Sequence, residues 1–229
     1  MAQVVEKLKL YDLMASIVPG VLLLGGIFVL FPNLLEPIQK PPVPDAVISL
    51  GIIVLAFFSG QIVQALSSLL EPALHWTWGG RPSARAFGKG LGDRYLPMET
   101  ALRVGRKIKT KSGAETDRAV FLNALAIAEG DAKSRTSDFN ASYGYHRSVV
   151  LLCSSLVLAF VAAGFVGTLA AVGRGTYLLA IVITVFITLL FWHRAKQRAF
   201  YFVREVLLVA ERNLDNPQQP QPTKGQTNG

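Results

Sequence analysis

Four uncharged apolar blocks constrain this 229-residue chain more than any other feature. They cover residues 13–31 (19 residues), 46–70 (25), 148–172 (25) and 176–192 (17), and none contains Asp, Glu, Lys or Arg. A membrane-spanning helix needs about 20 predominantly apolar residues, so the first three blocks qualify and the fourth does so narrowly. The pattern predicts an all-α integral membrane protein with four transmembrane helices and a small helical cytoplasmic lobe.

Composition supports a chain that is solvated largely by lipid. Hydrophobic residues make up 51% of the sequence and charged residues only 17%, with a mean hydropathy of +0.39. Soluble domains carry about a quarter charged residues. The first block is not expected to be a cleaved signal peptide, because its apolar core is long and no small-residue cleavage site follows it.

The distribution of basic residues predicts the topology. Residues 71–147 hold 13 Lys/Arg against 8 Asp/Glu, and residues 192–229 hold 6 against 3. The linkers at 32–45 and 173–175 carry only Lys40 and Arg174 as cations. The positive-inside rule then places the 71–147 segment and the C-terminus in the cytoplasm, and four spans place the N-terminus there too.

The blocks divide the chain into successive regions. Two transmembrane hairpins, residues 1–70 and 148–192, flank the basic cytoplasmic segment 71–147. The 32–45 linker contains five prolines and is expected to be a semi-rigid external loop. Residues 193–214 continue at helical spacing, which predicts a cytoplasmic extension of the fourth helix. The composition of 215–229 predicts a disordered tail.

Four polar side chains share one face at the end of the second span. Gln61, Gln64, Ser68 and Glu71 are spaced by three, four and three residues, which aligns them on a helix. Polar groups within a membrane usually turn toward protein or water. They could line a path through an oligomer, hydrogen-bond neighbouring helices, or simply reach the headgroups. The sequence leaves these alternatives open.

Two further features concern the helices themselves. Pro19 and Gly20 fall inside the first span, where a kink or re-entry is expected because proline removes a backbone hydrogen bond. In the third span, Ala159, Ala163 and Gly167 recur every four residues, a spacing that allows another helix to approach closely.

A basic run lies in the middle of the cytoplasmic segment. Residues 103–111 contain no acid, and their five cations are Arg103, Arg106, Lys107, Lys109 and Lys111; Arg81 and Arg85 could extend the patch. Such a run attracts anionic lipid headgroups, or it holds an anionic ligand such as a nucleotide or oligonucleotide. Both interpretations are retained.

The sequence offers no catalytic constellation. His75, His146 and His193 lie near the cytoplasmic ends of predicted spans, where amphipathic anchors are common, and Cys153 is the only cysteine. There is no H-E-x-x-H or G-x-S-x-G motif. We therefore expect no enzyme activity, no metal site and no cofactor.

Two segments resemble a group of known proteins. The stretch YDLMASIVPGVLLL (11–24) and the stretch FNASYGYHRSVVLL (139–152) resemble spans of small bacterial membrane proteins that accompany anti-phage defence systems, the Hailong-type membrane effectors. The resemblance implies a bacterial inner-membrane oligomer that depolarises the cell when a nucleic-acid-like signal changes. It assigns no functional residue.

These observations lead to one expected function and one alternative. The chain is expected to be a homo-oligomeric inner-membrane effector or channel whose basic lobe senses an anionic ligand, with Gln61 and Gln64 facing the path. The alternative is a non-conducting scaffold whose basic patch binds anionic lipid or a cytoplasmic protein partner. In both cases the lipid bilayer is a partner.

Overall fold

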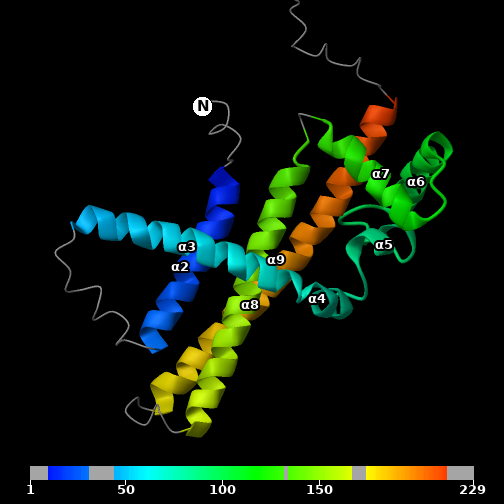
Figure 1. The fold of residues 1–229 in the computed structure, drawn as a ribbon. Coiled ribbons are helices and arrows are strands. Elements are labelled where there is room, and N and C mark those ends of the chain that lie inside the picture. The colour runs from blue at the N-terminus through cyan, green and yellow to red at the C-terminus, as the bar shows by residue number, and fades with distance from the viewer. Residues whose placement is uncertain (1–9, 31–43, 132–133, 167–173, 216–229) are drawn as a thin grey trace, which may run out of the picture. The chain divides into compact units, whose positions relative to one another are not determined.

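The computed structural model describes residues 10–30, 44–131, 134–166 and 174–215, and every regular element within these ranges is a helix (Figure 1). In chain order they are α2 (Leu10–Leu30), α3 (Asp45–Ser68), α4 (Glu71–Thr77), α5 (Pro82–Phe87), α6 (Met98–Ser112), α7 (Asp117–Glu129), α8 (Thr136–Val166) and α9 (Arg174–Asp215). The predicted all-α class is confirmed over the described ranges. Most of the predicted linker and all but the first residue of the predicted tail lie outside them.

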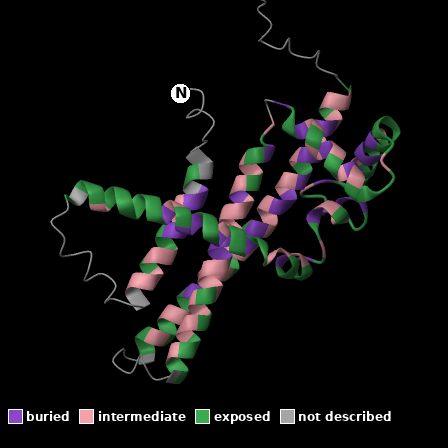
Figure 2. Cartoon of the chain, viewed as in Figure 1, coloured by how far each residue is buried: buried purple, intermediate pink, exposed green. Residues whose placement is uncertain are grey.

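Three helices are long and apolar enough to cross a membrane. These stretches are Ala46–Ser68, Thr136–Phe165 and Gly175–Asp215, within α3, α8 and α9. Figure 2 shows many exposed residues along α3, and large apolar side chains such as Phe58 and Phe186 lie on the surface. The first predicted span falls on α2, whose apolar stretch Ala15–Phe28 is shorter. The structure therefore suits a membrane protein with at least three spans.

The chain divides into two compact units. Unit 1 contains the described residues up to Gly79 together with Asp138–Ala199, and unit 2 contains Gly80–Ser137 together with the described residues from Phe200 onward. Helix α9 runs unbroken from Arg174 to Asp215, as the spacing beyond the fourth apolar block predicts, so it contributes to both units. Helix α8 begins at Thr136, twelve residues before its apolar block.

In unit 1, α2 and α3 cross at four small residues. Ser16 and Gly20 of α2 meet Ala56 and Gly60 of α3, and a Cβ atom added to either glycine would overlap a backbone carbonyl of the other helix. Small residues allow this approach, which increases dispersion contacts between the two helices. Pro19 is fully buried, and α2 continues through it without a break, so no re-entrant turn occurs here.

A second contact in unit 1 joins α4, α8 and α9. Trp78, which directly follows α4, is buried in a cluster with Leu74, Val150, Ala195 and Ala199, whereas Trp76 remains exposed. Trp192 donates a hydrogen bond from Nε1 to Thr77 Oγ1 at 3.0 Å. These contacts place the short α4 against the two long helices.

At the other end of α8, the partner is Tyr177 of α9. The Tyr177 hydroxyl donates to the Phe160 carbonyl, and a Cβ atom at Gly164 would meet that hydroxyl. The predicted packing residues Ala159 and Ala163 are half-buried, and Gly167 lies outside the described residues. The close approach described here is therefore made at Phe160 and Gly164.

Unit 2 has its own core, built by α5, α6, α7 and the last part of α9. Its fully buried side chains include Val104 and Ile108 of α6, Val120 of α7, and Val206 and Leu207 of α9. Gly113 caps the C-terminus of α6, and its φ of 68° is a left-handed conformation that glycine adopts without strain. Helix α7 begins at Thr116, whose side chain accepts a hydrogen bond from the Ala119 amide at 3.2 Å.

Candidate functional site

The basic run of the sequence falls on α6 and lines a groove in unit 2. Arg103, Lys107 and Lys111 are four residues apart, and Arg106 comes three after Arg103, so their side chains lie on one broad face of the helix. The other wall is the end of α9, with Leu214 and Asp215. The groove is open to solvent and has a volume of ≈ 580 Å³. Four of the five predicted cations of the run thus lie together.

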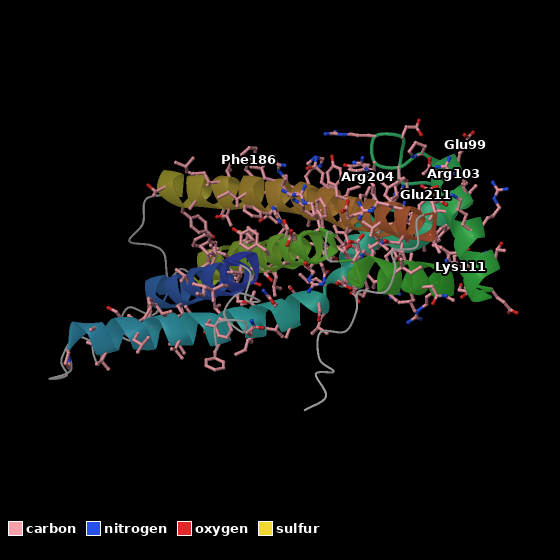
Figure 3. All side chains as sticks on the ribbon, turned by 90° about the horizontal axis from the view of Figure 1, so that it is seen from above. Glu99, Arg103, Lys111, Phe186, Arg204 and Glu211 are labelled. Carbon is pink, nitrogen blue, oxygen red and sulfur yellow. The ribbon has the colours of Figure 1, made fainter. Side chains whose placement is uncertain are left out.

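Two of these cations already contact acids of α9. Arg103 Nε lies 3.0 Å from Glu211 Oε1, and Lys107 Nζ lies 2.9 Å from Asp215 Oδ1 and 3.5 Å from Glu211 Oε1. Figure 3 shows Arg103 and Glu211 close together, with Lys111 toward the other end of α6. The hydrogen bond to Asp215 is the main reason that the pKa of Lys107 is raised above 10.5. Exposed pairs of this kind contribute little to stability.

The other two cations of the groove face solvent and have no acid beside them in the part of the chain that the structure describes. Arg106 and Lys111 are exposed, and neither has an acidic partner among the residues that the structure describes. Four cations facing two acids leave the groove with a net positive charge. An anion could bind there without first displacing an acid from Arg106 or Lys111.

The remaining predicted cations lie elsewhere in unit 2. Lys109 points to α7, where its Nζ lies 3.4 Å from Asp117 Oδ1. Arg81 is exposed just before α5, and the Arg85 guanidinium lies 5.5 Å from the centre of the Phe200 ring. The helical geometry of 98–112 explains the division, because Lys109 lies two residues from both Lys107 and Lys111 and so is turned away from them.

The two glutamines of α3 are used in the crossing with α2. Gln61 Nε2 donates to Ser16 Oγ at 2.7 Å, and Gln64 Nε2 donates to the Ala15 carbonyl at 2.8 Å. Ser68, by contrast, is exposed and donates to the Ala65 carbonyl of its own helix at 2.6 Å. The shared face predicted from the sequence therefore includes two side chains that join α3 to α2.

Glu71 belongs to a second polar contact, between the end of α3 and α8. It forms an ion pair with Arg147, whose Nε also donates to Ser67 Oγ at 3.0 Å. Ser67 Oγ lies 3.3 Å from Ser148 Oγ. Sequence reasoning gives no site role to Ser67, Arg147 or Ser148. A charge at the border of an apolar block was the available signal, but its partner lies 76 residues away.

A cavity of ≈ 310 Å³ lies between these two polar contacts within unit 1. Its polar lining comes from α2, α3 and α8, and its apolar lining includes Leu13 and Phe57. The polar residues are Ser16, Gln61, Gln64, Asn140, Tyr143 and Arg147. Three helices thus enclose a space that is polar on one part and apolar on another.

The histidines do not converge on a metal site. His146 lies beside Tyr145 and Phe191, His75 packs on Trp78, and His193 Nε2 lies 2.9 Å from Gln197 Nε2. Within the described ranges, no group of three or more His, Cys, Asp or Glu side chains is placed to hold a metal ion.

No protein-family model, curated protein or solved structure matches the chain. The resemblance to the defence-associated membrane effectors stays a prediction from the sequence.

Proposed function

We propose that this protein is a homo-oligomeric effector or channel of a bacterial inner membrane that responds to an anionic ligand bound in the α6–α9 groove. The single observation that carries the proposal is the groove lined by Arg103, Arg106, Lys107 and Lys111. The ligand class is a nucleotide or oligonucleotide, because guanidinium and ammonium groups bind phosphate oxygens through charge-assisted hydrogen bonds.

The membrane part of the proposal adds α2 as a fourth span to the three long apolar helices. Both termini are then cytoplasmic, with unit 2 in the compartment that holds nucleotides. Helix α9 offers a route by which ligand binding in the groove could affect the membrane part. The same unbroken helix carries Asp215, which lines the groove, and the apolar stretch that begins at Gly175. An anti-phage role follows only from the sequence resemblance.

A second candidate is a non-conducting scaffold that holds lipid or a cytoplasmic protein through the same groove. Its supporting observation is that Gln61 and Gln64 donate to Ser16 and Ala15, so the polar face of α3 serves the helix crossing. Interhelical hydrogen bonds of this kind contribute about 1 kcal/mol each. In this case neither glutamine needs to face water.

Binding to the purified full-length protein tests the groove. Fluorescent ATP and a fluorescent oligonucleotide are titrated against wild type and against the double variant Arg106→Gln/Lys111→Gln. The matched control is Lys89→Gln/Arg118→Gln, which removes one Lys and one Arg, both exposed in unit 2 and outside the groove. Loss of binding only in the groove variant supports the proposal. Equal loss in both variants indicates attraction by net charge, and binding to neither probe overturns the proposal.

Conductance in a planar bilayer separates an effector from a scaffold. A channel should give discrete currents that change when the bound ligand is added. Silence with and without ATP or oligonucleotide, from protein that binds one of them, favours the scaffold.

A further inference from the structure

The cavity in unit 1 combines one buried cation with amide and hydroxyl groups. Among the residues whose side chains the structure describes, Arg147 is the one charged residue in its lining, and its side chain is 12% exposed. The guanidinium is held in place by Ser67 through Nε, by Glu71 through Nη1 and by the Tyr143 ring, whose centre lies 5.3 Å from Cζ. The cavity therefore contains a cation that its own fold has positioned.

The donors that remain suit an anion. Arg147 donates through Nε to Ser67 and through Nη1 to Glu71, which leaves Nη2 for a further acceptor. Asn140 is exposed at the cavity wall, and the buried Tyr143 hydroxyl has no hydrogen-bond partner among the residues that the structure describes. A group with several acceptor oxygens would satisfy these donors together.

The place of the cavity along the helices indicates where that anion comes from. The apolar stretch of α3 ends at Ser68, and the uncharged block of α8 begins at Ser148, directly after Arg147. Both borders lie beside the cavity, at the level where spans meet headgroups. Phe57, one helical turn before Gln61, gives the cavity an apolar part. The lining thus has a polar part and an apolar part, which match the polar headgroup and the apolar chains of an amphiphile.

We propose that this cavity binds one phospholipid molecule through its headgroup phosphate. The phosphate oxygens accept from Arg147 Nη2, Asn140 and Tyr143, and the acyl chains leave past Leu13 and Phe57. The bound lipid then connects α2, α3 and α8, and its phosphate supplies acceptors for the donors that contacts within the protein do not use. The volume of ≈ 310 Å³ holds a headgroup, with the chains outside. This site is separate from the α6–α9 groove.

Native mass spectrometry of the full-length protein in detergent tests the proposal. Phosphatidylglycerol, diacylglycerol and glycerol phosphate are added separately, and bound molecules are counted. One phosphatidylglycerol should bind, whereas diacylglycerol, which lacks the phosphate, and glycerol phosphate, which lacks the chains, should bind far more weakly. Equal binding of diacylglycerol would overturn the phosphate contact. Equal binding of glycerol phosphate would show a site for soluble phosphates in place of lipid.

Variants locate the bound lipid. Asn140→Leu/Tyr143→Phe keeps the Tyr143 ring but removes two donors and should weaken retention about tenfold. Glu71→Gln should strengthen retention, because the charge of Arg147 is then uncompensated. Arg194→Gln is the control, since Arg194 is exposed in unit 1 and does not line the cavity. The proposal is overturned if the donor variant retains lipid like wild type, or if Arg194→Gln loses it equally.

Discussion

Gly60 of α3 lies so close to Ser16 of α2 that a Cβ atom at position 60 would overlap the Ser16 carbonyl oxygen. Gly20 has the same relation to Ala56 in the opposite direction along the two helices. The crossing is therefore specified by four small residues, two on each helix. Gln61 and Gln64 add hydrogen bonds on the side next to it.

Substitution of Gly60 by Val should separate α2 from α3. Added side-chain volume at a close contact costs about 1–3 kcal/mol, and here the clash is with backbone that cannot rotate away. Gly51→Val on the same helix is the control, because a Cβ atom at Gly51 meets nothing within 4 Å. Thermal unfolding in detergent, followed with a dye that reacts with the single Cys153, measures the difference. Equal transition temperatures for the two variants would contradict the close crossing.

The double variant Gln61→Leu/Gln64→Leu should destabilise the same crossing more mildly. Three interhelical hydrogen bonds are lost, two to the Ser16 hydroxyl and one to the Ala15 carbonyl, at about 1 kcal/mol each at most. Ser68→Ala removes a hydroxyl that bonds only within α3 and should have no measurable effect. The Cys153 assay applies here as well. A double variant as stable as wild type would mean that the glutamines have another role, and conductance would then be the decisive measurement.

The sequence predicts the helices well because long uncharged blocks have few alternatives in a bilayer. It also predicts that Arg103, Arg106, Lys107 and Lys111 share a face, since their spacing alone determines this. It could not predict that Glu211 and Asp215 would oppose that face, because they come from α9, more than 100 residues later. Partners across such a distance depend on packing, which no local pattern encodes.

The polar face of α3 illustrates the same limit. The spacing of Gln61 and Gln64 shows which way they point relative to each other, but not what lies opposite. Ser16 with Gly20, and Ala56 with Gly60, are pairs of small residues four apart, the same packing signal that the sequence analysis applied only to the third span. That spacing does not say which helix lies opposite, and the contacts of Gly20 and Gly60 with the facing backbone locate the crossing.

The Arg147–Glu71 pair should contribute more to stability than the pair between Lys109 and Asp117. Arg147 is 12% and Glu71 36% exposed, whereas Lys109 and Asp117 are 43% and 53% exposed. Removing one partner of a poorly solvated pair leaves a charge without compensation. We expect Glu71→Ala to lower the free energy of unfolding by about 1–3 kcal/mol. Asp117→Ala, measured by the same chemical denaturation, should stay within about 0.5 kcal/mol, and the reverse order would contradict the assigned burial.

Anion binding in the α6–α9 groove should not change with pH near neutrality. The pKa of Lys107 is raised above 10.5, chiefly by its hydrogen bond to Asp215, and arginine stays charged throughout. The α6–α9 contact made by charged Lys107 is therefore fully present below pH 10.5 and is lost as pH rises through the raised pKa. Titration of the fluorescent oligonucleotide, whose phosphodiesters stay ionised, between about pH 6 and 9 should give one affinity. A midpoint within that range would assign binding to a different titratable group.

Truncation of Ile108 should unfold α6 locally and leave unit 1 unchanged. Ile108 is 1% exposed in the core of unit 2, so Ile108→Ala creates a cavity that costs about 2–5 kcal/mol. Leu102→Ala is the control, because Leu102 lies on the same helix but is 38% exposed. Hydrogen exchange should accelerate in α6 and α7 of the Ile108 variant only, while the reactivity of Cys153 in α8 stays at the wild-type rate. If exchange in α8 accelerated equally, the two units would unfold as one cooperative body.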